Sequence, residues 1–296
     1  IYNLASKGMT LKMCLGNLKN FKDIKKKTRI EKKSSVMKYN LNIEQKNALK
    51  VISGSDKKFE VSVLIGVTGS GKTLVYFERI KELIKQNKQA LILIPEIFLT
   101  NQFKDRFKLF FGYEPAIWHS KISTNKKREI WNSVIKNEIK IVIGARSSLF
   151  LPFKNLGVII VDEEHDSSYK QEENVIYNAR DMAISRASIE NIPIHLITSV
   201  PSLETYNNII NRKYKKTELK KRFENYPLPK TKVVNLNLEN LNKSSISSES
   251  ISIAKQYLKK KNQILFFLNR RGYAPFLICK DCGFRHVCPN CSIYLT

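Results

Sequence analysis

Short apolar runs alternate with amphipathic stretches from about residue 39 onward. The short runs are rich in β-branched residues, which predicts strands, and apolar residues spaced three or four apart between them predict helices. Because the runs are apolar at successive positions, their strands should be covered on both faces, as in a parallel sheet of βαβ units. The predicted fold class is therefore α/β, with strands at 61–66, 90–95, 140–145, 157–162 and 194–198 and helices at 71–86, 99–110, 125–136, 179–190 and 202–211.

Two basic stretches with little apolar periodicity divide the chain into predicted parts. A helix at 251–261 and a strand at 263–268 open a second α/β unit after the second basic stretch. The chain begins with Ile1 and stops soon after a cluster of cysteines, so both ends resemble cuts through something larger. The predicted parts are a basic N-terminal arm or remnant of a DNA-binding region (1–38), the main α/β domain (39–211), a basic linker (212–250) and the start of the second unit (251–296).

The charge of the chain points toward polyanions. Lys plus Arg number 52 against 26 Asp plus Glu, which gives a formal net charge of +26. Such an excess favours nucleic acid as a partner. A lysine bias inherited from an A/T-rich genome gives the same composition without any ligand, so charge alone leaves both explanations open. The longest apolar runs fall far short of the roughly 18 residues that span a bilayer, so no membrane association is expected.

A glycine-rich loop between the strand at 61–66 and the next helix carries the strongest chemical signal. It fits the phosphate-binding pattern G-x-x-x-x-G-K-[ST]. Glycines let backbone N–H groups turn inward around phosphates at the positive end of a helix. Lys72 is expected to reach the β- and γ-phosphates of ATP, and the Thr73 hydroxyl to ligate Mg²⁺. The predicted nucleotide-binding residues are Gly66, Val67, Thr68, Gly69, Ser70, Gly71, Lys72 and Thr73.

An acidic pair follows the apolar strand at 157–162. Asp162 at the end of the strand is expected to help hold Mg²⁺, and Glu163 to polarise the attacking water. An isolated acidic cluster is usually a solvated turn, but the apolar strand before it and the phosphate loop upstream favour catalysis. The sequence therefore predicts an Mg²⁺-dependent NTPase with Lys72, Asp162 and Glu163 as catalytic residues.

Several segments resemble superfamily 2 helicases, and among these the PriA family, also called primosomal protein N′. Residues 162–165 (Asp-Glu-Glu-His) resemble helicase motif II, and residues 142–153 resemble the strand and loop that precede it in PriA proteins. The resemblance extends from about Leu41 to Thr296. Its other segments are 95–97, 162–171, 179–181, 267–275 and the paired cysteines.

This resemblance implies a RecA-like P-loop domain over 39–211 and the start of a second RecA-like domain from 251, interrupted by a zinc-binding cysteine insertion. It implies an ATP-dependent helicase that moves 3′ to 5′ on DNA and takes part in replication restart at stalled forks. The partners implied are forked or single-stranded DNA, primosome proteins and single-strand-binding proteins. The segment that carries the arginine finger of such motors has no counterpart before Thr296.

The same resemblance assigns roles to five further residues. Gln45 falls where family members recognise adenine, although a lone Gln is otherwise a surface residue. Arg146 falls in a DNA-contacting motif, and the alternative is an Arg that pairs with a structural carboxylate. Tyr169, Lys170 and Tyr177 fall in an aromatic-rich loop that contacts DNA, where aromatic faces stack on unpaired bases. The alternative for the tyrosines is packing under the rim of the sheet.

The chain departs from the family pattern at three positions. Val200 replaces a hydroxyl-bearing residue in motif III, and Thr198 or Ser199 is expected to substitute for it. Lys121 stands where the family has glycine, and Asn178 where it has histidine. Together these departures suggest relaxed constraint on the coupling of ATP hydrolysis to DNA movement.

Four cysteines occur as two C-x-x-C pairs near the end of the chain, a spacing typical of zinc ligands. Only five residues separate the pairs, so a single compact site is cramped. The resemblance implies instead that the pairs belong to two zinc sites whose remaining ligands lie past Thr296. A redox-active C-x-x-C is the weaker alternative. Metal-type cysteines and the lack of a visible signal peptide predict a cytoplasmic protein. The predicted ligands are Cys279, Cys282, Cys288 and Cys291.

Two alternatives to a working helicase stay open at this stage. The chain could be a remnant of a split gene that binds ATP and DNA without turnover. It could also be an RNA helicase or a restriction-type translocase. Comparison of DNA-stimulated with RNA-stimulated ATPase activity separates the nucleic-acid classes.

Overall fold

The computed structural model describes residues 39–54, 58–98, 100–172, 175–222, 230–235 and 246–267. The predicted N-terminal arm and the four cysteines of the C-x-x-C pairs lie outside these residues. The chain divides into two compact units, Ile1–Pro227 and Leu228–Thr296. Among the described residues, none of the helices combines the length and the apolar composition that crossing a membrane requires.

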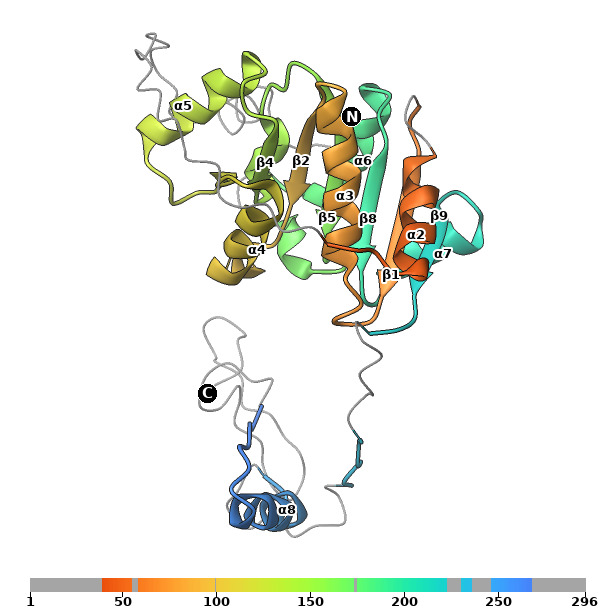
Figure 1. Ribbon diagram of the computed structural model, residues 1–296, viewed down its shortest axis with the longest axis vertical. Coiled ribbons are helices and arrows are strands. Elements are labelled where there is room, and N and C mark those ends of the chain that lie inside the picture. The colour runs from red at the N-terminus through yellow and green to blue at the C-terminus, as the bar shows by residue number, and fades with distance from the viewer. Residues whose placement is uncertain are drawn as a thin grey trace, which may run out of the picture. The chain divides into compact units, whose positions relative to one another are not determined.

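A seven-stranded sheet forms the centre of the first unit, and every strand pairing in it is parallel (Figure 1). The strand order is β3-β4-β2-β5-β8-β1-β9. This arrangement confirms the predicted α/β fold with a parallel sheet. The strands are β1 (Val61–Gly66), β2 (Gln89–Leu93), β3 (Ala116–Trp118), β4 (Ile141–Gly144), β5 (Leu156–Asp162), β8 (Ile194–Thr198) and β9 (Lys215–Leu219).

Helices cover both faces of the sheet, which explains why its strands are apolar at successive positions. One buried cluster joins the sheet to α2, α3 and α4, and a second joins its other face to α5, α6 and α7. Figure 1 shows α3 running along the sheet beside β2 and β5. The helices are α2 (Ile43–Ser53), α3 (Lys72–Lys85), α4 (Asn101–Phe111), α5 (Thr124–Ile135), α6 (Ala179–Ile189) and α7 (Leu203–Ile210).

Among the described residues, three short helical turns and a small hairpin lie in the loops that follow the strands. The hairpin pairs β6 (Lys170–Gln171) with β7 (Tyr177–Asn178) in antiparallel orientation. It follows β5 and therefore lies in the segment predicted to contact DNA. The short turns are η1 (Glu96–Phe98), η2 (Arg146–Phe150) and η3 (Ser167–Tyr169).

The first domain continues past residue 211, where the sequence predicted that it ends. Strand β9 pairs in parallel with β1 and closes one edge of the sheet. Its sequence, Lys-Lys-Thr-Glu-Leu, is basic because the strand is exposed on one side, and lysines on an edge strand discourage pairing with another chain. The compact units divide at Pro227, inside the predicted linker 212–250.

The second unit holds one helix among its described residues, α8 (Ser248–Lys259). It begins earlier than predicted because Ser247 caps it, accepting a hydrogen bond on its Oγ from the backbone N of Ser250 (3.0 Å). The strand predicted at 263–268 is not formed over the described residues 263–267. A strand requires a hydrogen-bonded neighbour, and the described part of this unit contains none.

Candidate active site

The phosphate loop connects β1 to α3 through two glycines in the left-handed region. Gly69 has φ of 82° and Gly71, the N-cap of α3, has φ of 83°. A Cβ on Gly71 would lie 2.4 Å from Nε2 of Gln45, whereas a Cβ on Gly69 would meet nothing within 4 Å. The backbone at residue 71 therefore requires glycine both for its conformation and for the space beside it.

The polar groups of the loop fit a bound phosphate. Lys72 lies at the start of α3, and its Nζ donates to the carbonyl oxygen of Gly66 (2.8 Å), which folds the ammonium group over the loop. Ser70 Oγ is buried and has no hydrogen-bond partner among the described residues. A buried hydroxyl without a partner costs free energy, and an anion held at this helix N-terminus would supply the missing partner.

Gln45 lies directly beneath the loop and is almost fully buried, at 1% exposure. Its Nε2 donates to the carbonyl oxygen of Ser70 (3.0 Å), and its Oε1 accepts from the backbone N of Asn42 (2.9 Å). Asn42 in turn accepts from the backbone N of Gln45, which completes a capping box at the start of α2. In this structure Gln45 braces the loop, and adenine recognition by Gln45 stays a prediction.

Asp162 ends β5 with both carboxylate oxygens engaged. Its Oδ2 accepts from the Tyr76 hydroxyl (2.8 Å) and its Oδ1 from the backbone N of Glu163 (3.0 Å). Burial raises the pKa of Asp162 to about 6, with the Tyr76 hydrogen bond and the Lys72 charge opposing the rise. Burial also raises the pKa of Tyr76 well above its usual value, with Asp162 adding to the rise and a hydrogen bond with Thr73 opposing it.

Glu163 is held in a backbone conformation that non-glycine residues seldom adopt, with φ of 47°. Such strain is concentrated at functional sites. Its Oε2 lies 3.7 Å from Nδ1 of His165, and that nitrogen lies 2.8 Å from Oγ1 of Thr198. Thr198 also donates to the carbonyl oxygen of Val200 (2.7 Å). The hydroxyl that contacts motif II is thus supplied by Thr198, although Val200 has lost its own.

Glu164 is a structural residue in spite of its place in the acidic motif. It is buried and accepts hydrogen bonds from Arg180 Nη1 (3.2 Å), Ser202 N (2.8 Å) and Thr205 Oγ1 (2.9 Å). These partners lie on α6 and at the start of α7. Asn178, which departs from the family pattern, caps α6 by accepting from the backbone N of Arg180 (3.0 Å).

The two tyrosines predicted to stack on DNA bases are buried in this structure. Tyr169 is 1% exposed, and its hydroxyl donates to the carbonyl oxygens of Asp162 (2.6 Å) and Leu93 (3.0 Å). Tyr177 is 7% exposed and packs edge-on against Phe150, with ring centroids 5.6 Å apart. Neither ring presents a face to a base here, which corresponds to packing under the rim of the sheet.

The two basic residues predicted to contact DNA lie together beside the hairpin. Arg146 Nη1 donates to the carbonyl oxygen of Lys170 (2.7 Å), so η2 and β6 are tied to each other. The Lys170 ammonium is exposed and pairs with Glu172, with Nζ 2.8 Å from Oε1. Among the residues that the structure describes, the partner found for Arg146 is a carbonyl group.

The predicted zinc ligands lie outside the described residues. Within the part of the chain that the structure describes, no group of three or more His, Cys, Asp or Glu side chains is placed to hold a metal ion. The two side chains predicted to hold Mg²⁺ are Thr73 and Asp162. A pair of ligands is compatible with this cation, because proteins usually bind Mg²⁺ by one or two groups together with phosphates and water.

Comparison with known proteins confirms the resemblance predicted from the sequence. Residues 38–215 match the family model described as "Type III restriction enzyme, res subunit". Replication restart protein PriA of Rickettsia conorii is 45% identical over 256 residues, which cover 86% of this chain and 39% of that protein. PriA of Bacillus subtilis is 42% identical over 239 residues, which cover 80% of this chain and 30% of that protein. The chain therefore spans less than half the length of these relatives.

A solved structure shares the fold at low sequence identity. The crystal structure of DUF1998 helicase MrfA superposes with a TM-score of 0.51 and 20% identity, covering 78% of this chain and 36% of that one. This likeness shows that the sheet and its helices share the fold of a RecA-like domain.

Proposed function

We propose, on the premise that this chain belongs to the family described as the res subunit of type III restriction enzymes, that it is the ATP-binding motor part of a 3′–5′ DNA helicase of replication restart. The observation that supports the proposal is that Asp162 lies beside the phosphate loop, within reach of the Lys72 charge and of Tyr76 on α3, in a chain 45% identical over 256 residues to a PriA protein. A cytoplasmic location is part of the same proposal, because replication restart acts on DNA inside the cell.

The residues around the loop divide the work of binding ATP. The backbone N–H groups between Gly69 and Thr73 bind the phosphates at the N-terminus of α3. Lys72 exchanges its contact with the Gly66 carbonyl for the β- and γ-phosphates. Gln45 keeps the loop open from below, since its hydrogen bond to the carbonyl oxygen of Ser70 fixes that peptide.

The two acidic residues have separate tasks. Thr73 and Asp162 are the side chains that hold Mg²⁺, and their oxygen atoms are the ligand type that this cation prefers. Bound Mg²⁺ supplies positive charge against the phosphate oxygens. Glu163 projects from the strained position next to Asp162, where it orients a water molecule and accepts its proton. Its contact with His165 links this carboxylate to Thr198 in motif III.

DNA is the proposed nucleic acid. The exposed Lys170 and the neighbouring Arg146 follow the carboxyl ends of β5 and β4, and a bound phosphate backbone would compete with Glu172 for Lys170. Stacking by Tyr169 or Tyr177 requires these rings to leave their buried positions. Primosome and single-strand-binding proteins are the protein partners that the likeness to replication restart proteins suggests.

Zinc is the proposed second metal. Four thiolates are the donor set that Zn²⁺ takes in closed structural sites, so Cys279, Cys282, Cys288 and Cys291 fit that ion. The likeness to PriA proteins suggests two sites, each completed by further ligands, and the five residues between the pairs make a single site cramped.

A chain that binds ATP and DNA without turnover is the second candidate. The observation that favours it is the set of departures from the family pattern at Lys121, Asn178 and Val200. A restriction-type translocase is a third candidate, which the description of the matched family favours.

Steady-state ATPase activity, measured with and without forked DNA, tests the proposal. We expect hydrolysis that DNA stimulates and that Glu163→Gln abolishes, while the variant still binds ATP. Nucleotide binding without turnover in the unaltered chain would support the second candidate. Stimulation by RNA and not by DNA would contradict the assignment to DNA replication.

A further inference from the structure

Tyr76 is a buried residue of the site that the proposed mechanism leaves without a task. It lies on α3, one helical turn after Thr73, and its side chain is fully buried. Residues three positions apart on a helix share a face, so Tyr76 and Thr73 point toward the same end of β5. The Tyr76 hydroxyl donates to Oδ2 of Asp162 at 2.8 Å.

Thr73 and Asp162 are separated by 89 positions and come from the two halves of the nucleotide site, α3 and β5. Tyr76 lies on the half that carries Thr73 and hydrogen-bonds the carboxylate of the other half. The tyrosine hydroxyl therefore bridges the two halves of the cation site.

We propose that Tyr76 is a positioning residue for the magnesium site, whose hydroxyl fixes the Asp162 carboxylate in its orientation before the cation binds. This inference rests on the proposed function, because it concerns the same nucleotide site. The backbone N of Glu163 holds Oδ1 and Tyr76 holds Oδ2, so the plane of the Asp162 carboxylate cannot rotate. Each oxygen keeps one further lone pair for a cation or its water.

Packing alone does not account for a tyrosine at this position. The ring packs edge-on against Phe77, with centroids 5.1 Å apart, and phenylalanine would fill that space equally well. What the hydroxyl adds is the hydrogen bond to Asp162. A residue that acts on a metal through its ligands tunes metal affinity, and loss of such a partner typically costs roughly 10–100-fold.

Tyr76→Phe tests this inference because it removes the hydroxyl and keeps the ring. The measurement is the Mg²⁺ concentration that half-saturates binding of a fluorescent ADP analogue to the chain. We expect this concentration to rise roughly 10-fold or more in the variant, with little change in binding when Mg²⁺ is absent. The matched control is Tyr113→Phe, which removes a hydroxyl from a tyrosine of α4's following loop that is 37% exposed; its Mg²⁺ dependence should equal that of the unaltered chain.

A double-mutant cycle with Asp162→Asn separates a positioning role from a structural one. If Tyr76 acts through the carboxylate, adding Tyr76→Phe to Asp162→Asn should shift the Mg²⁺ dependence much less than it does alone. A lowered melting temperature with unchanged Mg²⁺ dependence would overturn the inference and leave the proposed function intact. If the unaltered chain bound the nucleotide without any Mg²⁺ dependence, the proposed function itself would fail, and this inference with it.

Discussion

The two left-handed glycines of the phosphate loop give a matched pair of substitutions. Gly69→Ala introduces a Cβ into open space, so it should lower the free energy of unfolding only by the cost of the left-handed conformation, about 1–2 kcal/mol. Gly71→Ala incurs the same cost and also forces its Cβ against the Gln45 amide. Overpacking of this kind adds about 1–3 kcal/mol, so Gly71→Ala should be the less stable variant by roughly that amount.

Urea unfolding of both variants measures this difference, and circular dichroism before unfolding establishes that each has folded. Equal stabilities would mean that Gln45 swings away without cost and does not brace the loop. The control is Gly71→Ala made in a Gln45→Ala background, where the obstructing side chain is gone. There Gly71→Ala should lower the free energy of unfolding, relative to Gln45→Ala alone, only by the cost of the left-handed conformation.

For single residues, the sequence predicts those parts of the site whose spacing is dictated by phosphate binding. It does not predict contacts that depend on packing. The phosphate loop and the Asp162–Glu163 pair follow from a local pattern that binding of phosphate requires. The burial of Tyr169 does not, because its hydroxyl reaches carbonyl groups at the ends of two different strands, β2 and β5. Tyr76 was missed for the same reason, since only the fold brings it to Asp162.

Substitutions at the adjacent residues Glu163 and Glu164 should differ in their effect on stability, because the two side chains contact different elements. Glu164 joins the end of β5 to α6 and α7 through Arg180, Ser202 and Thr205, and its side chain is fully buried. Removing the buried charge of Glu164 leaves Arg180 with only the exposed carboxylates of Asp181 and Glu204 as ion-pair partners, so Glu164→Gln should lower the free energy of unfolding by about 3 kcal/mol. Glu163→Gln, at a partly exposed side chain, should change it by about 0.5 kcal/mol or less.

Thermal or urea unfolding of the two variants, alongside their ATPase activities, checks this contrast. We expect Glu163→Gln to keep the stability of the unaltered chain and lose ATP hydrolysis. We expect Glu164→Gln to unfold at a lower temperature or urea concentration than the unaltered chain. Similar stability losses for both would show that the Glu164 network adds nothing beyond what a neutral amide supplies.

The elements that the sequence missed are short or polar. All five strands predicted within 39–211 are present, since long apolar runs covered on both faces leave a clear signal. The two strands of the large sheet that were missed are its edges: β3 has only three residues, and β9 reads as part of a basic linker. Helix α2 was also missed, although the Asn42–Gln45 capping box marks its start in the sequence.

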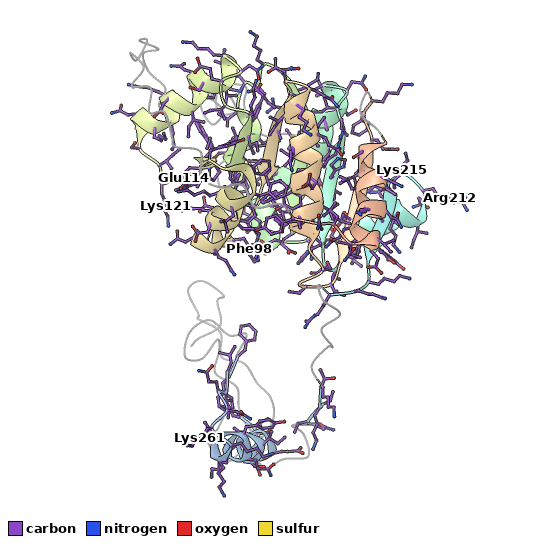
Figure 2. All side chains as sticks on the ribbon, viewed as in Figure 1. Phe98, Glu114, Lys121, Arg212, Lys215 and Lys261 are labelled. Carbon is purple, nitrogen blue, oxygen red and sulfur yellow. The ribbon has the colours of Figure 1, made fainter. Side chains whose placement is uncertain are left out.

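Across the whole molecule, the positive charge is not confined to the loops beside the nucleotide site. Figure 2 shows Lys121, which follows the edge strand β3, on one side of the sheet, and Arg212 and Lys215, beside and within the opposite edge strand β9, on the other. Some of these lysines are neutralised locally, as Lys215 is by Glu60. The net charge of +26 nevertheless leaves a large excess to meet an anionic partner.

Counterion release therefore predicts a steep salt dependence of DNA binding. If about six phosphates are neutralised, affinity for forked DNA should fall roughly 1,000-fold between 50 and 200 mM salt. Fluorescence anisotropy of labelled DNA measures this directly.

Lys72→Ala is the matched variant, because it removes one positive charge at the phosphate loop. It should abolish tight ATP binding and leave DNA affinity and its salt slope nearly unchanged, since the Lys72 ammonium contacts the loop carbonyl of Gly66. A flat salt dependence in the unaltered chain would contradict an electrostatic DNA interface, and equal ATP affinity in the variant would contradict the phosphate loop, so DNA binding and ATP binding are tested independently.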